Sequence, residues 1–299
     1  MAEAPPFPPP KRPLTWLITG ASSGFGLSLA RLAQARGHTV IATSRNPART
    51  PDLAREIEAR GGRWLELDVD DAARGPQLVE ELEAGGTAVD VLVNCAGFAI
   101  YGAAEGFSDD EVRREFETLF FGPYRLMRAV APHMRRRRFG VIANVSSSAA
   151  LQPVLAMGIY GAAKAAQDSI SKVMAREMNP FNVRILCINP SVFDTNMKNV
   201  LQFQEKPLDQ DYEGSVLDMT LKHFKSGSHV PEGDTEKAVK AIYEVIVCEG
   251  VGEGREKEQV LPLGCTAAKQ SQQIVDNWTH TLDVFRDVAV SVDHDKARK

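Results

Sequence analysis

The chain has 299 residues, of which 43% are hydrophobic and 25% charged, a composition typical of a globular protein with one large or two smaller domains. Its 35 Lys and Arg residues against 39 Asp and Glu give a net charge of −4, which excludes a general basic field for nucleic acid. No apolar run approaches the ~18 residues of a membrane span, and the first residues lack the apolar core of a secretion signal. The four scattered cysteines lack metal-ligand spacing, so we expect reduced thiols, no metal site and a cytoplasmic protein.

After a proline-rich segment over 1–13, expected to be a disordered tail, short apolar runs alternate with longer amphipathic runs. The apolar runs predict strands over 14–19, 39–43, 64–69, 89–94, 140–145 and 183–188. The amphipathic runs predict helices over 26–36, 53–59, 109–134, 160–178, 236–247 and 267–288. Such alternation is typical of βαβ units. We therefore predict an α/β fold over 14–264, a single Rossmann-type domain with a doubly wound parallel sheet and helices on both faces.

Two segments fall outside this alternation. Residues 191–235 lose periodicity and mix Gly, Pro and charge, which predicts a long loop with short helices and a functional role. Residues 265–299 are expected to form a C-terminal helical extension and tail. The basic run 135–138 follows the predicted helix 109–134, where cations favour the negative end of the helix dipole. A solvated helix terminus is the simpler interpretation, and an anion or partner patch is the alternative.

Glycines cluster between the first predicted strand and the first predicted helix, at Gly20, Gly24 and Gly26. Glycine permits a tight turn and lets backbone N–H groups approach a pyrophosphate, which the positive end of the following helix also favours. The position of this GxxxGxG run between strand and helix predicts dinucleotide binding. A tight strand–helix turn without a ligand is the alternative.

The second predicted strand ends at Ser44 and Arg45. An NAD-selective site usually has a carboxylate near here for the ribose 2′-hydroxyl. A guanidinium instead suits a 2′-phosphate through charge-assisted hydrogen bonds, so the pair predicts NADP(H). An arginine solvated at a strand end is the alternative.

Three polar residues could act on a carbonyl group. Tyr160 and Lys164 are four residues apart, so they share one helix face, and an ammonium near a phenol is expected to lower the phenol pKa towards working pH. Tyr160 would then be a general acid. Ser147 follows the strand 140–145, from which its hydroxyl could reach the same oxygen. Alone, a Tyr and a Lys at this spacing would be a surface pair.

The sequence resembles the single-domain short-chain dehydrogenases/reductases over about 14–263. The motifs that carry this resemblance are 19–26 (TGASSGFG), 68–69 (DV), 94–97 (NCAG), 144–147 (NVSS), 160–164 (YGAAK) and 189–195 (NPSVFDT). The resemblance implies that Tyr160 is the acid/base, that Lys164 binds the nicotinamide ribose and tunes Tyr160, and that Ser147 orients the carbonyl. It also implies that the segment 191–235 is a substrate lid.

The resemblance further implies the cofactor contacts. Asp68 and Val69 would meet adenine, residues 94–97 would line the cleft, and Thr195 would hold the carboxamide. The complete predicted cofactor set is Gly20, Ser22, Ser23, Gly24, Phe25, Gly26, Ser44, Arg45, Asp68, Val69, Asn94, Ala96, Gly97, Tyr160, Lys164, Pro190, Val192 and Thr195. The pair at 44–45 resembles the NADP-preferring members, and the chain loosely resembles fungal carbonyl reductases of secondary metabolism near the steroid and retinol dehydrogenase-like branch.

Three positions depart from the family pattern. Leu119 replaces a common Asn that supports a water-linked proton relay, and a leucine cannot hydrogen-bond water. The relay is then rerouted or proton delivery is slow. Ser191 replaces the Gly of a usual Pro-Gly pair and restricts the backbone beside the nicotinamide. Cys95 replaces a position that is often Ala, a change expected to be neutral for packing.

We predict an NADPH-dependent reduction of a ketone or aldehyde to an alcohol, or the reverse reaction. The alternatives are a regulatory cofactor-binding protein, which Leu119 would suit, and a biosynthetic enzyme that performs a cyclisation or elimination without redox turnover. Apolar residues of the lid favour a bulky hydrophobic substrate, although they could equally seat the lid on the domain: Val192, Phe193, Met197, Leu201 and Phe203. Family members often associate through helices corresponding to 109–134 and 160–178, which would give a homodimer or homotetramer, but the sequence does not fix the oligomeric state.

Overall fold

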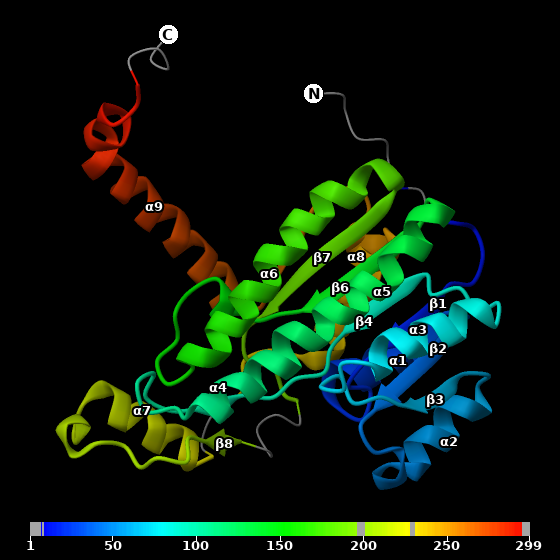
Figure 1. Cartoon of the computed structure of the whole chain (residues 1–299), viewed down its shortest axis with the longest axis horizontal. Helices are drawn as coiled ribbons and strands as arrows, with labels where there is room; N and C mark the ends of the chain where they lie inside the picture. Colours follow the sequence, from blue (N-terminus) through cyan, green and yellow to red (C-terminus); the bar gives the residue numbers. More distant parts are fainter. Residues whose placement is uncertain (1–6, 8, 196–200, 228–230, 295–299) are drawn as a thin grey trace.

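A computed structural model describes residues 7, 9–195, 201–227 and 231–294. Seven parallel strands form one sheet in the order β3-β2-β1-β4-β6-β7-β9 (Figure 1). The strands are β1 (Thr15–Ile18), β2 (Thr39–Ser44), β3 (Arg63–Glu66), β4 (Val91–Asn94), β6 (Gly140–Val145), β7 (Val183–Pro190) and β9 (Val260–Leu263). The strand order reverses between β1 and β4, which confirms the predicted doubly wound Rossmann-type architecture.

Helices cover both faces of the sheet (Figure 1). The helices of the described chain are α1 (Gly24–Ala35), α2 (Pro51–Ala59), α3 (Arg74–Ala84), α4 (Asp109–Phe116), α5 (Gly122–Arg137), α6 (Gly158–Met178), α7 (Val216–Lys225), α8 (Thr235–Val247) and α9 (Cys265–Ser291), of which α7 and α9 lie away from the sheet. Successive strand residues alternate between the two faces, so Trp16 and Ile18 join one core with α1 and α8. Leu17 joins the other core, with α3, α5 and α6. Both faces of β1 are therefore buried, which explains its continuous apolar run.

The structure divides the predicted helix 109–134 into three parts. A π-helical segment, Glu117–Phe121, lies between α4 and α5 and includes Leu119. Periodicity cannot reveal a local widening of one turn, because the apolar positions shift by only one residue. Two short strands were also unpredicted: β5 (Ile100–Tyr101) and, in the predicted lid, β8 (Gln202–Phe203). These two-residue strands pair with each other.

The seventh strand, β9, pairs with β7 at the sheet edge and was not predicted. Its four residues are half-exposed or exposed and include Pro262, features that a short edge strand tolerates and a central strand does not. The long helix α9 follows it and extends away from the body of the protein (Figure 1).

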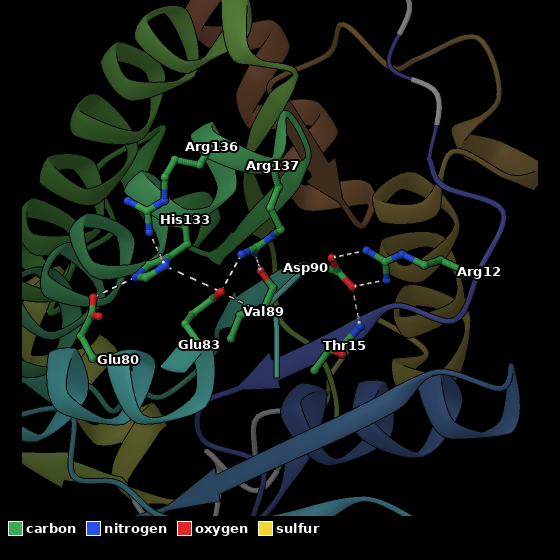
Figure 2. Close-up of polar contacts among 9 residues, drawn as sticks. All are labelled: Arg12, Thr15, Glu80, Glu83, Val89, Asp90, His133, Arg136 and Arg137. Atoms are coloured by element: carbon green, nitrogen blue, oxygen red, sulfur yellow. Dashed lines mark hydrogen bonds and ion pairs between the residues drawn. The ribbon is translucent and has the colours of Figure 1, made fainter. Parts of the chain in front are cut away.

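The N-terminal segment is packed where the structure describes it, which differs from the disordered tail expected over 1–13. Phe7 is buried and stacks on Phe139 with ring centroids 5.3 Å apart. Arg12 donates two hydrogen bonds, of 2.7 and 2.8 Å, to the buried carboxylate of Asp90, which also accepts from the Thr15 N–H (Figure 2). Asp90 is unusual as a buried acid directly before β4, and this ion pair explains its burial.

The basic run at the end of α5 makes its contacts within the protein. Arg136 contacts His133, and Arg137 binds the carboxylate of Glu83 and the carbonyl of Val89 (Figure 2). Arg138 donates to the Pro180 carbonyl. These contacts agree with the helix-terminus interpretation, because the guanidinium groups fasten α5 to α3 and to the start of β4.

Among the described residues, no helix combines the length and apolar character that crossing a bilayer requires. The four cysteines all lie in described segments and are free thiols.

Candidate active site

The glycine-rich turn connects β1 to α1 at the carboxyl edge of the sheet. Gly20 and Gly24 have φ values of +65° and +53°, which favour glycine. A Cβ on Gly20 would lie 2.7 Å from the Cα of Ala96, and one on Gly26 would lie 2.5 Å from the Gly20 carbonyl oxygen. Neither position therefore admits a side chain. The first turn of α1 contains no acidic residue, and the N-cap residue Ser23 makes no side-chain capping hydrogen bond. The backbone N–H groups of this first turn are therefore suited to binding an anion.

Two other predicted cofactor segments lie against this turn. The Thr19 hydroxyl accepts hydrogen bonds from the N–H groups of Cys95 (3.0 Å) and Ala96 (3.2 Å), which holds the segment 94–97 beside the glycines. Thr195 also approaches the turn, since a Cβ on Gly24 would lie 3.3 Å from its Cβ. The structure thus brings together segments that are up to 175 residues apart in sequence.

Asn94 differs from its neighbours, because its side chain points into the sheet. Its Nδ2 donates to Oδ1 of Asn144 on β6 (2.7 Å), and Asn144 donates to Ser171 on α6 (2.7 Å). This buried chain fixes α6 against the two central strands. The side chain of Asn94 thus has a structural role, and its place in lining the cofactor cleft stays a prediction.

The end of β2 is the predicted position of the adenosine ribose. The Ser44 hydroxyl is buried and accepts a hydrogen bond from Nε1 of Trp64 (3.0 Å), so it supports β3. Arg45 is exposed, and within the described part of the chain its guanidinium has no hydrogen-bond partner. Its positive charge lowers the pKa of Asp70, while burial, the larger effect, raises that pKa. Asp68 accepts from the Asp70 N–H (3.1 Å), so both acids are near the predicted adenine position.

The remaining predicted cofactor residues follow the same edge. Val69 is buried against Gly122, at the start of α5. Pro190 ends β7 and pairs with Leu263 of β9, and Val192 is exposed just beyond it. Phe25 packs edge-on against Phe193, with ring centroids 5.4 Å apart, which seats the base of the predicted lid on α1.

Ser147, Tyr160 and Lys164 converge beyond β6. Tyr160 and Lys164 lie on one buried face of α6, and Ser147 caps the short helix that follows β6. The Ser147 hydroxyl forms a hydrogen bond with Tyr160 and also accepts from the Ala149 N–H (3.1 Å). The Lys164 ammonium donates to the carbonyl of Val145 (2.7 Å) and more weakly to Oε1 of Gln167 (3.4 Å).

The pKa of Tyr160 is raised in this structure, whereas the sequence predicted that the neighbouring Lys164 would lower it. Burial raises the pKa of Tyr160 above its ordinary value, and the hydrogen bond from Ser147 only partly opposes this. Burial also lowers the pKa of Lys164 to about 8. The physical reason is that a phenolate and an ammonium both lose hydration in this site, while the ammonium is directed at Val145 rather than at the phenol.

A buried polar chain supports Ser147, and sequence analysis missed it. Asn189 donates to the Ser147 carbonyl (3.0 Å) and to the Asp168 carboxylate (2.8 Å). Asp168 lies four residues after Lys164, so the same 160/164/168 spacing could have placed it on the catalytic face of α6. Its negative charge also raises the pKa of Lys164 against the effect of burial.

Leu119, which departs from the family pattern, is part of the apolar wall of the site. Leu119 is fully buried in one cluster with Tyr101 and Tyr160, and its Cδ2 would lie 3.0 Å from a Cβ on Gly97. Cys95 lies nearby, and burial raises the pKa of its thiol to about 11, which keeps the thiol neutral. Both departures therefore present uncharged groups to the site.

A second buried acid, Glu115, lies one turn before Leu119. One carboxylate oxygen accepts from the Ile100 N–H (2.7 Å), and the other is buried without a partner in the described part of the chain. Burial raises the pKa of Glu115 to about 7. Its negative charge raises the pKa values of Tyr101 and Tyr160.

The predicted lid closes over this wall. Tyr101 contacts Phe203 on β8 and Phe224 on α7, with ring centroids 5.8 and 4.5 Å apart. The β5–β8 pairing and a hydrogen bond from Arg114 to Gln202 fasten the lid to the body. Met197, which was predicted to belong to the apolar set of the lid, lies outside the described residues.

Comparisons with known proteins identify similar sequences and folds among the short-chain dehydrogenases. The short chain dehydrogenase family profile matches residues 15–206. The chain is 38% identical to the oxidoreductase claN of Passalora fulva over 62% of this chain and 84% of that protein. It is 34% identical to a 3-ketodihydrosphingosine reductase of Bacteroides thetaiotaomicron over 73% of this chain and 80% of that protein.

Solved structures show the same fold. A short-chain dehydrogenase from Streptomyces avermitilis superposes with a TM-score of 0.82 at 32% identity, covering 95% of this chain and all of that one. Complexes with either cofactor occur on this fold. A metagenomic short-chain oxidoreductase was solved in complex with NADP; it is 29% identical, has a TM-score of 0.57, and the match covers 59% of this chain and 81% of that one. A Burkholderia phymatum protein was solved in complex with NAD; it is 21% identical, has a TM-score of 0.69, and the match covers 83% of this chain and 88% of that one. This chain belongs to the short-chain dehydrogenase/reductase family of oxidoreductases.

Proposed function

We propose that the protein is an NADPH-dependent carbonyl reductase, or the reverse alcohol dehydrogenase, that acts on a bulky hydrophobic substrate. The observation that carries this proposal is the convergence of Ser147, Tyr160 and Lys164 beside the glycine-rich turn at the strand-order reversal. Ligands of open α/β sheets bind at this place. Ser147 and Tyr160 provide two hydroxyl groups for one substrate oxygen atom, and Lys164 provides a positive charge.

The reaction needs a hydride and a proton. The nicotinamide supplies the hydride when it is bound, and residues of this chain donate or accept the proton. The high pKa of Tyr160 keeps the phenol protonated, so it can donate to the carbonyl oxygen as negative charge develops there. Ser147 donates a second hydrogen bond to this oxygen, and Asn189 holds Ser147 in place.

Lys164 would bind the nicotinamide ribose and favour the phenolate left after this transfer, while the net pKa of Tyr160 before the transfer stays raised. Its ammonium is fixed by Val145, and its pKa of about 8 leaves it largely charged at neutral pH. A fixed positive charge near a phenolate offsets the cost of burying negative charge.

The preference for NADPH rests on Arg45. Its guanidinium is exposed at the end of β2, and no carboxylate follows Ser44 directly to accept a ribose 2′-hydroxyl. The positive charge of Arg45 would also offset the repulsion between a 2′-phosphate and the nearby carboxylates of Asp68 and Asp70.

The preference for a bulky apolar substrate rests on the wall around Tyr160. Its buried members are apolar or aromatic, and partly buried apolar side chains of the lid pack against them: Leu201, Phe203, Leu208, Leu217 and Phe224. Burying such surface stabilises an apolar ligand by about 25 cal/mol per Å². The relative that is named for reduction of 3-ketodihydrosphingosine supports a ketone as the reacting group.

The decisive experiment follows the absorbance of NADPH, then NADH, at 340 nm with bulky and small carbonyl compounds. We expect substrate-dependent oxidation that is fastest with NADPH and bulky ketones. Tyr160→Phe should reduce kcat by at least about 100-fold while cofactor binding, followed by fluorescence quenching, stays unchanged. Near-normal turnover by Tyr160→Phe would refute the acid/base assignment, and fastest turnover of small polar aldehydes would refute the substrate class.

A second candidate function is a cyclisation or elimination without redox turnover, or cofactor binding for regulation. The buried Leu119 favours it, because an apolar side chain beside Gly97 cannot hold a water for proton delivery. Product formation that is independent of NADPH oxidation would support this second function. Leu119→Asn tests the premise, since a large gain in rate would show that proton delivery is impaired.

A further inference from the structure

Helix α9 carries an exposed apolar stripe along its length. Only Ala267 among its residues is buried, and the helix extends away from the body (Figure 1). Val275, Trp278, Leu282 and Phe285 are each between 52% and 65% exposed. Large apolar side chains that gather on one exposed helix face usually mark an interaction surface.

The spacing of the stripe is that of a helix–helix seam. Its members follow one another in alternating steps of three and four residues: Val275, Trp278, Leu282, Phe285, Ala289 and Val292. Repeats of this kind place one side chain of each turn on a single line, as in the a and d positions of a heptad. Ile274 and Val288 flank the line on one side and widen it.

We propose that α9 binds the α9 helix of a second copy of this chain in antiparallel orientation. In an antiparallel pair each a position faces a d position of the partner. Trp278 then faces the partner's Leu282, and Phe285 faces the partner's Val275. Each large aromatic ring meets a smaller aliphatic side chain, so the same stripe is complementary to itself.

The charges beside the seam fit the same register. Arg286 lies next to the stripe and would meet the partner's Asp276, and the two-fold symmetry repeats this contact. In the single chain, Arg286 is exposed and forms only a loose ion pair with Asp283 (3.2 Å). In a parallel pair each residue would instead face the same residue of the partner. Two Trp278 rings would then have to fit side by side in one layer of the interface.

A membrane surface suits this helix less well. Helices that bind anionic lipid carry Lys and Arg on the polar face. Here Asp276, Asp283 and Asp287 outnumber Lys269 and Arg286. The α9 interface is also separate from the helices 109–134 and 160–178, through which association was expected from the family resemblance.

Sedimentation velocity of the full chain tests the interface. We expect Leu282→Asp and Phe285→Asp to halve the mass of the assembly and to raise the dimer dissociation constant by at least about 100-fold, because two buried apolar side chains are lost per dimer. Val284→Asp is the matched control, because it adds the same charge next to Phe285 but off the stripe, and its mass should stay unchanged. Circular dichroism verifies that each variant is folded.

Equal masses for the wild type and the two stripe variants would overturn the proposal. So would vesicle binding by the wild type, measured with phosphatidylserine-containing vesicles and lost in Phe285→Asp without any change in mass. Trp278 gives an independent signal, because Trp16 and Trp64 are both buried. Its emission should shift to the red when the wild type is diluted.

Cross-linking tests the orientation in a Cys265→Ser background, which removes the exposed native thiol of α9. In the antiparallel register Thr281 lies beside the partner's Thr281. Thr281→Cys should therefore be linked by a short bis-maleimide, whereas Leu282→Cys should not. Linking through Leu282→Cys alone would indicate a parallel pair and overturn the antiparallel arrangement.

Discussion

Glu115→Gln should change the pH dependence of stability. Glu115 is fully buried, and its pKa is raised from about 4.5 to about 7 by burial. The folded protein therefore binds a proton between these values that the unfolded chain releases. Stability from this group is fully present below pH 4.5 and is lost as the pH rises towards 7. With 1.36 kcal/mol per pKa unit, the loss amounts to about 3 kcal/mol.

Glutamine keeps the acceptor for the Ile100 N–H but cannot ionise. Its NH₂ group takes the place of the buried carboxylate oxygen that has no partner, which adds a cost of about 1–3 kcal/mol at every pH. The informative quantity is therefore the change with pH in the stability difference between variant and wild type. Relative to wild type, Glu115→Gln should become more stable by about 3 kcal/mol between pH 4.5 and pH 8.

Urea unfolding at half-unit steps over this range measures the difference. Glu111→Gln is the matched control, because Glu111 lies one turn earlier on α4 and hydrogen bonds from Ser108 and Glu205 lower its pKa. Because the pKa of Glu111 is lowered, both states are ionised well above the ordinary value of a glutamate, so its variant should show a constant difference over the upper half of this pH range. A stability difference for Glu115→Gln that stays constant within 0.5 kcal/mol, taken as a rough experimental error, would refute the assignment of a raised pKa.

Three further predictions concern the cofactor site and the N-terminal segment. Arg45→Glu should raise the KM for NADPH by at least about 10-fold and leave the KM for NADH little changed; equal effects on both would refute the 2′-phosphate contact. Gly26→Ala should abolish cofactor binding in a fluorescence titration, because its Cβ would lie 2.5 Å from the Gly20 carbonyl oxygen, and normal binding would contradict the tight turn. Arg12→Ala should lower the free energy of unfolding by about 1–3 kcal/mol, measured in urea at pH 7, because Asp90 is only 1% exposed and would keep a buried charge. An unchanged midpoint would show that the N-terminal segment does not stabilise the domain.

The sequence alone was sufficient for the architecture. Buried parallel strands are continuous apolar runs, and glycine is needed where β1 turns tightly into α1, so both can be recognised from residue type and order. The convergence of Ser147, Tyr160 and Lys164 was also expected, because Tyr160 and Lys164 share one helix face, Ser147 follows a strand and the three match the family motifs. Their roles in the reaction stay predictions that the kinetic experiments test.

Other features depended on contacts between residues far apart in the sequence. Strand β9 forms only because β7 offers an edge, and Leu119 of the π-helical segment packs in one cluster with Tyr160 of α6. The direction of the Tyr160 pKa was decided by burial, which residue spacing cannot measure. The packing of Phe7 likewise depends on a residue far away in the sequence, since its ring stacks on Phe139. Residue types and their order therefore determined the strands, the turn and the chemical groups, whereas tertiary structure decided which of those groups lose water, and hence their charge.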